Sequence, residues 1–407
     1  MRVLHAVIRR AAPLALALFL AACGVDAGSA PTLTPDPALP ATAAALFPSL
    51  APTVAPTPTP LAAGDSAGAI ARLVDAMQSA VLRRDPAAYL ALVDHSDPVF
   101  ALEQRHWVDD WDTPGVILNF TLAIRNLTLA AGGQAASADL TMTWSTLADV
   151  QTSRGADFPA RFTRGADGQW RYAGEGWATA LEAGPFLVRA MPGLEATAAS
   201  VAAFLPGVYA HVTQALEHTP AGPLEVKLYD NPWTLVATTR LSLTAAVGGW
   251  SSAPGEALKI VAAGAGEAAL AYHFARYTLA DLAGGTPGSL PVWALEGAAE
   301  VVAARYWTQA DRNTRLLRLQ ERRQAEGLAS WDVLAAAGRT ADRLSDYARL
   351  QGYAMLVYVS ETYGEAARNA WLRALAGGPP EEATPSALGV TFAALNEGFL
   401  AWLDSRF

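Results

Sequence analysis

Hydrophobic residues recur at two different spacings along the chain, and the spacing changes near residue 115. Before this point, apolar residues spaced for one face of a helix predict an amphipathic helix that Asp65 or Ser66 can cap. These apolar residues are Ile70, Leu73, Val74, Met77 and Val81. Asp85-Pro86 then predicts the start of a second, shorter helix.

From residue 115 the pattern alternates or is rich in β-branched and aromatic residues, which predicts antiparallel strands. They are expected over about 115–128, 135–146, 157–163 and 170–177. Asp167-Gly168, between the last two, is typical of a hairpin turn. Helices followed by a sheet therefore predict one α+β domain over residues 64–183.

The pattern changes again in residues 186–407, where two short strands precede a series of helices. Apolar and polar residues alternate from Leu224 to Tyr229, and 258–261 is a second apolar run. Helices are predicted at about 267–282, 291–300, 312–326, 331–337, 345–363 and 392–403. The expected fold class is thus α+β, with a mostly helical second domain that has a small sheet near its N-terminus.

The first 63 residues fit neither domain. Three arginines precede an apolar stretch of 12 residues, Ala11 to Ala22, which is shorter than the ~20 residues that span a bilayer as a helix. We interpret residues 1–22 as an export signal. Residues 23–63 are rich in Ala, Pro and Thr and carry almost no charge, which predicts a disordered tether.

The single cysteine of the chain follows the export signal directly. Leu20-Ala21-Ala22-Cys23 resembles the lipoprotein box of bacteria. This resemblance implies that Cys23 receives a diacylglyceryl group, and two or more lipid chains anchor a protein stably. We therefore expect an extracytoplasmic protein that is anchored to a membrane through lipidated Cys23. The alternative is an ordinary exported protein with an idle thiol.

Composition limits the classes of partner. The length of 407 residues suits two domains besides the N-terminal segment. A net charge of -9 without any basic run makes nucleic acid and anionic lipid head groups poor partners. The hydrophobic share of 52% overstates the core, because the signal and the alanine-rich tether account for part of it.

The order of elements in residues 64–183 resembles the cone-shaped α+β domain of the nuclear-transport-factor-two-like superfamily. Helices come first, and a curved antiparallel sheet ends in a hairpin over 162–170. The superfamily contains both enzymes and inert partners, so the fold alone does not define a function. Five tryptophans either line a ligand pocket or fill the core of the cone. They are Trp107, Trp111, Trp144, Trp170 and Trp177.

Few polar residues of this first domain suggest chemistry. Asp109, Asp110 and Asp112 either bind a cation or form an exposed acidic loop, and we favour the loop. His95 and His106 have no convincing partner.

The second domain carries a sharper motif, Trp293-x-x-Glu296-Gly297-x-Ala299-Glu300. It resembles the second zinc-site helix of the gluzincin-type, peptidase MA-like metallopeptidases, and the order of elements resembles theirs over nearly all of residues 186–407. In that group an earlier helix bears H-E-x-x-H, which supplies two zinc ligands and the general base. The resemblance implies that Glu296 stands at the position of the third zinc ligand.

The first zinc motif is degenerate in this chain. Alignment of residues 271–277 with the family pattern places Tyr272 and Arg276 at the two histidine positions, and His273 at the position of the general base. Tyr is a poor zinc ligand, and Arg cannot be one because its guanidinium stays protonated. We therefore expect no conventional zinc site and no catalytic residues.

A charge pair can replace the metal. Glu296 would still point at the old metal position, where an unpaired buried carboxylate is costly. We expect Arg276 to pair with Glu296, and Glu300 to join the pair. Such a pair would preserve the packing of the two helices without any chemistry.

Rival sites use some of the same residues. His273 with Glu296 and Glu300 would make a metal set of one His and two carboxylates, although His273 lies ~100° around the helix from Tyr272 and need not face the same cleft. The two glutamates alone are more often a structural or solvated pair. His211 and His218 could share a helix face, and the Ser251 region lacks the spacing of a nucleophile elbow.

These features favour a lipid-anchored protein that binds a peptide or a protein at the cell envelope through a peptidase-like cleft. In this interpretation no cofactor is needed. The alternative is an active metallopeptidase-type hydrolase with altered ligands, which would use zinc. A third possibility is that the first domain carries the function and the second supports it.

Overall fold

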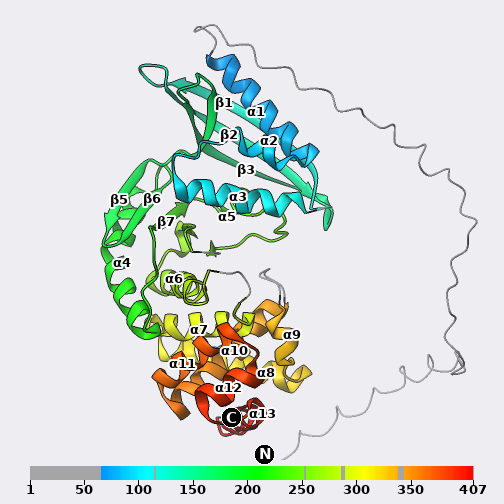
Figure 1. Ribbon diagram of the computed structural model, residues 1–407, viewed down its shortest axis with the longest axis vertical. Helices are drawn as coiled ribbons and strands as arrows, with labels where there is room; N and C mark the ends of the chain where they lie inside the picture. The colour runs from blue at the N-terminus through cyan, green and yellow to red at the C-terminus, as the bar shows by residue number, and fades with distance from the viewer. Residues whose placement is uncertain (1–65, 114–115, 252–253, 286–288, 338–342, 407) are drawn as a thin grey trace, which may run out of the picture. The chain divides into compact units, whose positions relative to one another are not determined.

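The computed structural model describes residues 66–113, 116–251, 254–285, 289–337 and 343–406 (Figure 1). The predicted export signal, Cys23 and the predicted tether lie outside these residues. The chain from Pro60 to Phe407 forms one unit of dense internal contact.

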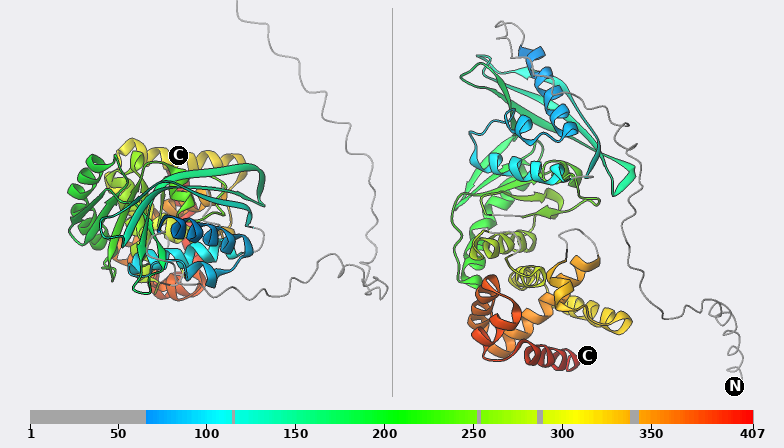
Figure 2. Two further views of the ribbon diagram at one scale, coloured as in Figure 1. Left: turned by 90° about the horizontal axis from the view of Figure 1, so that it is seen from above. Right: turned by 45° about the vertical axis from the view of Figure 1, so that its right-hand side comes forward.

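The first part of this unit consists of three helices on a curved sheet. The helices are α1 (Ser66–Arg83), α2 (Pro86–Leu90) and α3 (Pro98–Asp112). The strands are β1 (Ile117–Leu129), β2 (Ala135–Thr146), β3 (Asp149–Arg164) and β4 (Trp170–Glu175), all antiparallel in the order β1-β2-β3-β4. The sheet curves around the helices, as Figure 1 and Figure 2 show. The predicted order of helices followed by an antiparallel sheet is confirmed.

Helix α3 corrects one prediction. Asp97 accepts hydrogen bonds from the first free backbone N–H groups of this helix, and Pro98 occupies a position that needs no N–H donor. Asp109, Asp110 and Asp112 lie near its C-terminal end, so the prediction of an acidic loop is wrong. Asp110 is buried and accepts a hydrogen bond of 2.9 Å from the backbone N–H of Ser242.

A second, mixed sheet follows, with the strand order β5-β6-β7-β9-β8. Its strands are β5 (Thr179–Ala183), β6 (Phe186–Ala190), β7 (Leu224–Tyr229), β8 (Gly249–Trp250) and β9 (Leu258–Val261). The central strands β6, β7 and β9 run parallel, and β5 and β8 pair antiparallel at the two edges. The predicted domain division between residues 183 and 186 falls in the turn that joins β5 to β6.

Helices complete the chain. They are α4 (Glu195–Leu216), α5 (Pro232–Ala237), α6 (Glu267–Leu282), α7 (Val292–Ala303), α8 (Gln309–Glu326), α9 (Trp331–Ala335), α10 (Arg343–Tyr363), α11 (Glu365–Gly377), α12 (Pro380–Leu388) and α13 (Phe392–Asp404). In the described part of the chain, no single helix has the length and hydropathy of a membrane span, whereas the bent pair α12 and α13, at 77°, meets that test jointly. The apolar residues Leu395, Phe399 and Leu403 of α13 are buried in the core of the second part.

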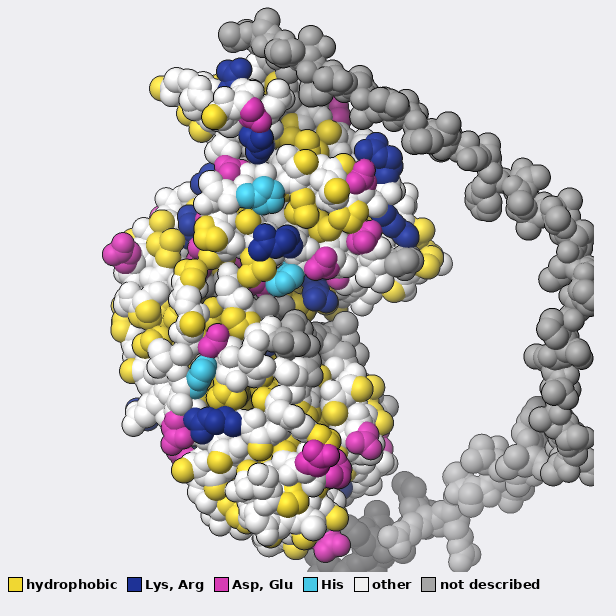
Figure 3. All heavy atoms as spheres, in the orientation of Figure 1, with side chains coloured by type: hydrophobic (Ala, Val, Ile, Leu, Met, Phe, Trp, Pro, Cys, Tyr) yellow, Lys and Arg dark blue, Asp and Glu magenta, His cyan; other side chains and the backbone are white. Residues whose placement is uncertain are grey.

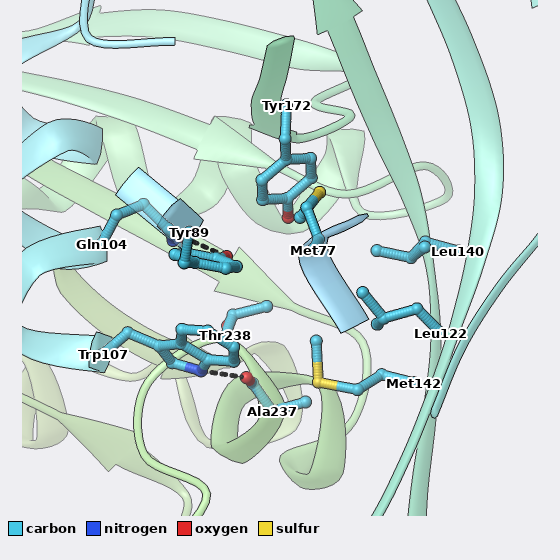
Figure 4. Close-up of a pocket in the computed structure, with 10 residues that line it drawn as sticks. All are labelled: Met77, Tyr89, Gln104, Trp107, Leu122, Leu140, Met142, Tyr172, Ala237 and Thr238. Atoms are coloured by element: carbon cyan, nitrogen blue, oxygen red, sulfur yellow. Dashed lines mark hydrogen bonds between the residues drawn. The ribbon is translucent and has the colours of Figure 1, made fainter. Parts of the chain in front are cut away.

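The core of the first part is completed by residues from the second. Between β7 and β9 the chain enters the mouth of the cone, where Trp107 Nε1 donates to the Ala237 carbonyl at 2.8 Å and Trp144 Nε1 donates to the Leu241 carbonyl at 3.1 Å. Figure 4 shows a cavity in this core, whose volume of about 10 Å³ holds one water molecule at most. The side chains of Trp107, Trp111, Trp144 and Trp170 are therefore core residues, as the second of the two sequence interpretations holds.

A buried set of charges also joins α3 to the second sheet. Lys227 Nζ on β7 lies 2.5 Å from Glu103 Oε2 on α3, and Lys259 Nζ on β9 lies 3.7 Å from the same oxygen. Burial lowers the pKa of Lys227, but the carboxylates of Glu103 and Glu175 outweigh it, so that the net pKa is raised. Because a buried charge is costly without its partner, this set fixes α3 against the sheet.

Charges on the surface are mixed in sign. On the face shown in Figure 3, basic side chains lie among acidic ones and do not gather into one patch.

Candidate binding cleft

An open cleft of about 520 Å³ lies where the edge strand β8 meets helices α6, α7, α8 and α10. Its wall includes residues 246–250, and its polar lining residues are Tyr272, His273, Glu296, Glu300, Arg315, Ser345 and Arg349. Four of the five predicted site residues therefore line one cleft, and Arg276 packs behind them.

The predicted pair between Arg276 and Glu296 is confirmed. Arg276 Nη2 on α6 lies 3.1 Å from Glu296 Oε1 on α7, and both side chains are 8% exposed. The hydroxyl of Tyr272, one helical turn before Arg276, donates to Glu296 Oε2. Both oxygens of the carboxylate are thus occupied. Burial lowers the pKa of Arg276, but the carboxylate of Glu296 outweighs it and the net pKa is raised, so the guanidinium stays charged.

Two glycines let α7 and α10 approach closely enough to build this cleft. A Cβ atom on Gly297 would lie 2.3 Å from the backbone carbon of Gly352, and one on Gly352 would lie 2.0 Å from the Trp293 carbonyl oxygen. No side chain fits at either position. The glycine of the motif around Glu296 therefore has a packing role, because it sets the distance between the two helices that carry Glu296, Glu300 and Arg349.

Glu300 does not join the pair of Arg276 and Glu296. Its Oε2 lies 2.8 Å from Arg315 Nε on α8, and its Oε1 lies 3.5 Å from Arg349 Nε on α10. The prediction that Glu300 completes the first pair is wrong. Burial raises the pKa of Glu300 and outweighs the opposing effect of the two arginines. Glu296 and Glu300 are both buried, so they are not a solvated pair.

His273 faces the same cleft as Tyr272, which the ~100° between them on the helix did not require. Its ring packs edge-on against the ring of Tyr272, with 5.0 Å between centroids, and its Nε2 would lie 2.3 Å from a Cβ atom on Gly249. Its Nδ1 lies 3.2 Å from Ser251 Oγ. Burial, followed by the charges of Arg276 and Arg349, lowers the pKa of His273 to about 3. The imidazole is therefore neutral and a very weak base at neutral pH.

The remaining candidate histidines have partners of other kinds. His211 contacts the Val302 carbonyl at 2.9 Å, and His218 Nε2 lies 2.8 Å from Asp281 Oδ2. His95 contacts the Leu90 carbonyl, and His106 Nδ1 lies 2.5 Å from Glu256 Oε1. Within the described ranges, no three His, Cys, Asp or Glu residues lie close enough together to hold a metal ion. His273, Glu296 and Glu300, the rival metal set, therefore do not lie close enough together either.

Two cleft residues were not singled out from the sequence as site residues. Arg315 stacks on the ring of Trp307, with 3.4 Å from its guanidinium carbon to the ring centroid. The guanidinium carbon of Arg349 lies 5.7 Å from the ring centroid of Tyr272. Arg349 also contacts Glu300, an ion pair that the sequence pattern does not predict.

Comparison with known proteins adds little to this geometry. No protein-family model matches the chain, and no curated protein matches it. A solved structure of an NTF-2-like protein of unknown function from Shewanella oneidensis MR-1 is 13% identical, and the match covers 26% of this chain and 93% of that one. The TM-score of this match is 0.22, so the chain bears a weak likeness to an NTF-2-like protein over about a quarter of its length.

Proposed function

We propose that this protein binds a peptide or an extended protein segment in the cleft and does not hydrolyse it. We further propose that lipid on Cys23 anchors it to a membrane outside the cytoplasm. Residues 64–183 and 186–407 are then a nuclear-transport-factor-two-like support and a peptidase MA-like binding part.

The pair of Arg276 and Glu296 is the observation that carries this proposal. In the gluzincin-type interpretation, Tyr272, Arg276 and Glu296 stand at the three zinc-ligand positions. A guanidinium has no lone pair to give to a metal, and both oxygens of Glu296 already accept from Tyr272 or pair with Arg276. The site supplies its own positive charge, which supports a role in packing and binding.

The edge of the second sheet supports an extended ligand. Strand β8 pairs with β9 on one side only, and its other side lies at the cleft. Gly248 and Gly249 line the cleft without side chains, so the backbone there is accessible. An exposed strand edge recognises an extended peptide by adding it as a further strand.

Hydrolysis by Ser251 and His273 is a second candidate, because the two side chains lie 3.2 Å apart. Two observations make it weaker. Ser251 is 2% exposed and is not part of the cleft lining, so a substrate does not reach it. The pKa of His273, at about 3, leaves it unable to activate a hydroxyl efficiently near neutral pH.

The test is binding of a random decapeptide library to the full chain, purified in mild detergent and immobilised. A Cβ atom on Gly248 has open space around it, so Gly248→Phe should fold and fill the cleft, whereas Gly248→Ala should leave it open. We expect wild type and Gly248→Ala to retain a subset of peptides intact, and Gly248→Phe to weaken their binding at least about tenfold. Retention that is equal in all three proteins, or cleaved peptides in the mass spectrum, would contradict the proposal.

A further inference from the structure

The two arginines and two glutamates that line the cleft balance, but the cleft together with Arg276 behind it does not. The cleft and the pair behind it contain three guanidinium groups, of Arg276, Arg315 and Arg349, but only the two carboxylates of Glu296 and Glu300. His273 is neutral, as described above. One positive charge is therefore in excess at the floor of the cleft, in a chain whose net charge is -9.

Arg349 carries this excess positive charge. Arg276 and Glu296 pair with each other, and Arg315 holds Glu300 at the shorter distance of 2.8 Å. Arg349 reaches Glu300 only at 3.5 Å, and its side chain is 44% exposed. A guanidinium has five donors arranged for bidentate binding of a carboxylate, and the contact of Arg349 with Glu300 is through Nε.

The excess charge lies at the end of a path that starts at β8. Gly249 lies against the ring of His273, and this ring packs edge-on against the ring of Tyr272. The guanidinium carbon of Arg349 lies 5.7 Å from the centroid of the Tyr272 ring. The path is short enough that a few residues of extended chain can cover it. A peptide added to β8 can therefore reach Arg349 with its end.

Resting on the proposed function, we infer that the ligand is the C-terminal segment of a peptide or protein, whose free α-carboxylate binds Arg349 while its backbone pairs with β8. The single charge of an α-carboxylate matches the single excess charge of the cleft. An amidated or internal segment leaves Arg349 without that partner.

The inference is tested with one fluorescein-labelled octapeptide library, synthesised with either a free C-terminal carboxylate or a C-terminal amide, and with the full chain in detergent. N-acetylalanine serves as a competitor that carries a carboxylate without a peptide chain. Arg349→Gln removes the charge and leaves Glu300 paired with Arg315. Arg318→Gln, at an exposed position of α8 outside the cleft lining, is the control with the same change in net charge.

We expect the carboxylate form to bind about tenfold to a hundredfold more tightly than the amide. Arg349→Gln should abolish this difference at an unchanged melting temperature, and Arg318→Gln should keep it. Equal binding of both forms to wild type would overturn the inference and leave peptide binding intact. Full competition by N-acetylalanine at the affinity of the peptides would show a small-carboxylate site and also overturn it. Binding of neither form would contradict the proposed function itself.

Discussion

Replacing Arg276 with Met is expected to lower the free energy of unfolding by about 3–5 kcal/mol, because it leaves the buried carboxylate of Glu296 without its positive partner. The hydrogen bond from Tyr272 remains, but it does not neutralise the charge. Chemical denaturation of the full chain, followed by circular dichroism, measures the loss.

The double variant Arg276→Met with Glu296→Gln removes both charges and should recover most of this stability. Arg318→Met removes a charge from an exposed position of α8 and should have little effect. Arg276→His should also destabilise the protein without producing peptidase activity. A single variant as stable as wild type would show that the pair does not hold α6 against α7.

Expression of residues 64–183 alone is expected to give an unfolded or aggregated product. The core of the cone contains apolar residues from beyond this range, and they are fully or nearly fully buried. They are Met191, Tyr229, Leu235, Val236, Ala237, Leu241, Leu243, Trp250 and Val261. Loss of their burial amounts to on the order of 10 kcal/mol, which is as large as the whole stability of a typical domain.

The matched control is the chain from residue 60 to 407, which contains both cores and should unfold cooperatively. Thermal unfolding and the dispersion of amide signals in an NMR spectrum distinguish the two products. A cooperative transition in the 64–183 fragment would show that the first part is an independent domain, and that the inserted residues of the second part are dispensable.

Much of the fold could be predicted wherever the sequence of a single helix or strand is enough to indicate its structure. The apolar period of α1 is regular over many residues, whereas α6 and α7 are buried over nearly continuous runs and lack such a period. Helix α3 was missed because Glu103 and Asp110 interrupt its apolar face, and only their partners Lys227 and Ser242, more than 100 residues away, explain why they are buried. Strand β8 has two residues and carries no sequence pattern of its own.

In the candidate site, too, some contacts could be predicted from the sequence and others could not. The contact of Arg276 with Glu296 could be predicted, because the resemblance to a zinc-peptidase motif places the two residues opposite each other and a buried carboxylate needs a cation. The partners of Glu300 could not, because α8 and α10 bring Arg315 and Arg349 from separate parts of the sequence. The orientation of His273 depends on its contact with Gly249 on β8, which the helix alone does not specify.

The central claim is that a protein ion pair occupies the position of a catalytic metal. The most direct test is the zinc content of the full chain, measured by elemental analysis after incubation with excess zinc and extensive dialysis. We expect far less than one zinc per chain in wild type, and the same low content in Glu296→Gln. About one tightly held zinc per chain in wild type, lost in Glu296→Gln, would contradict it.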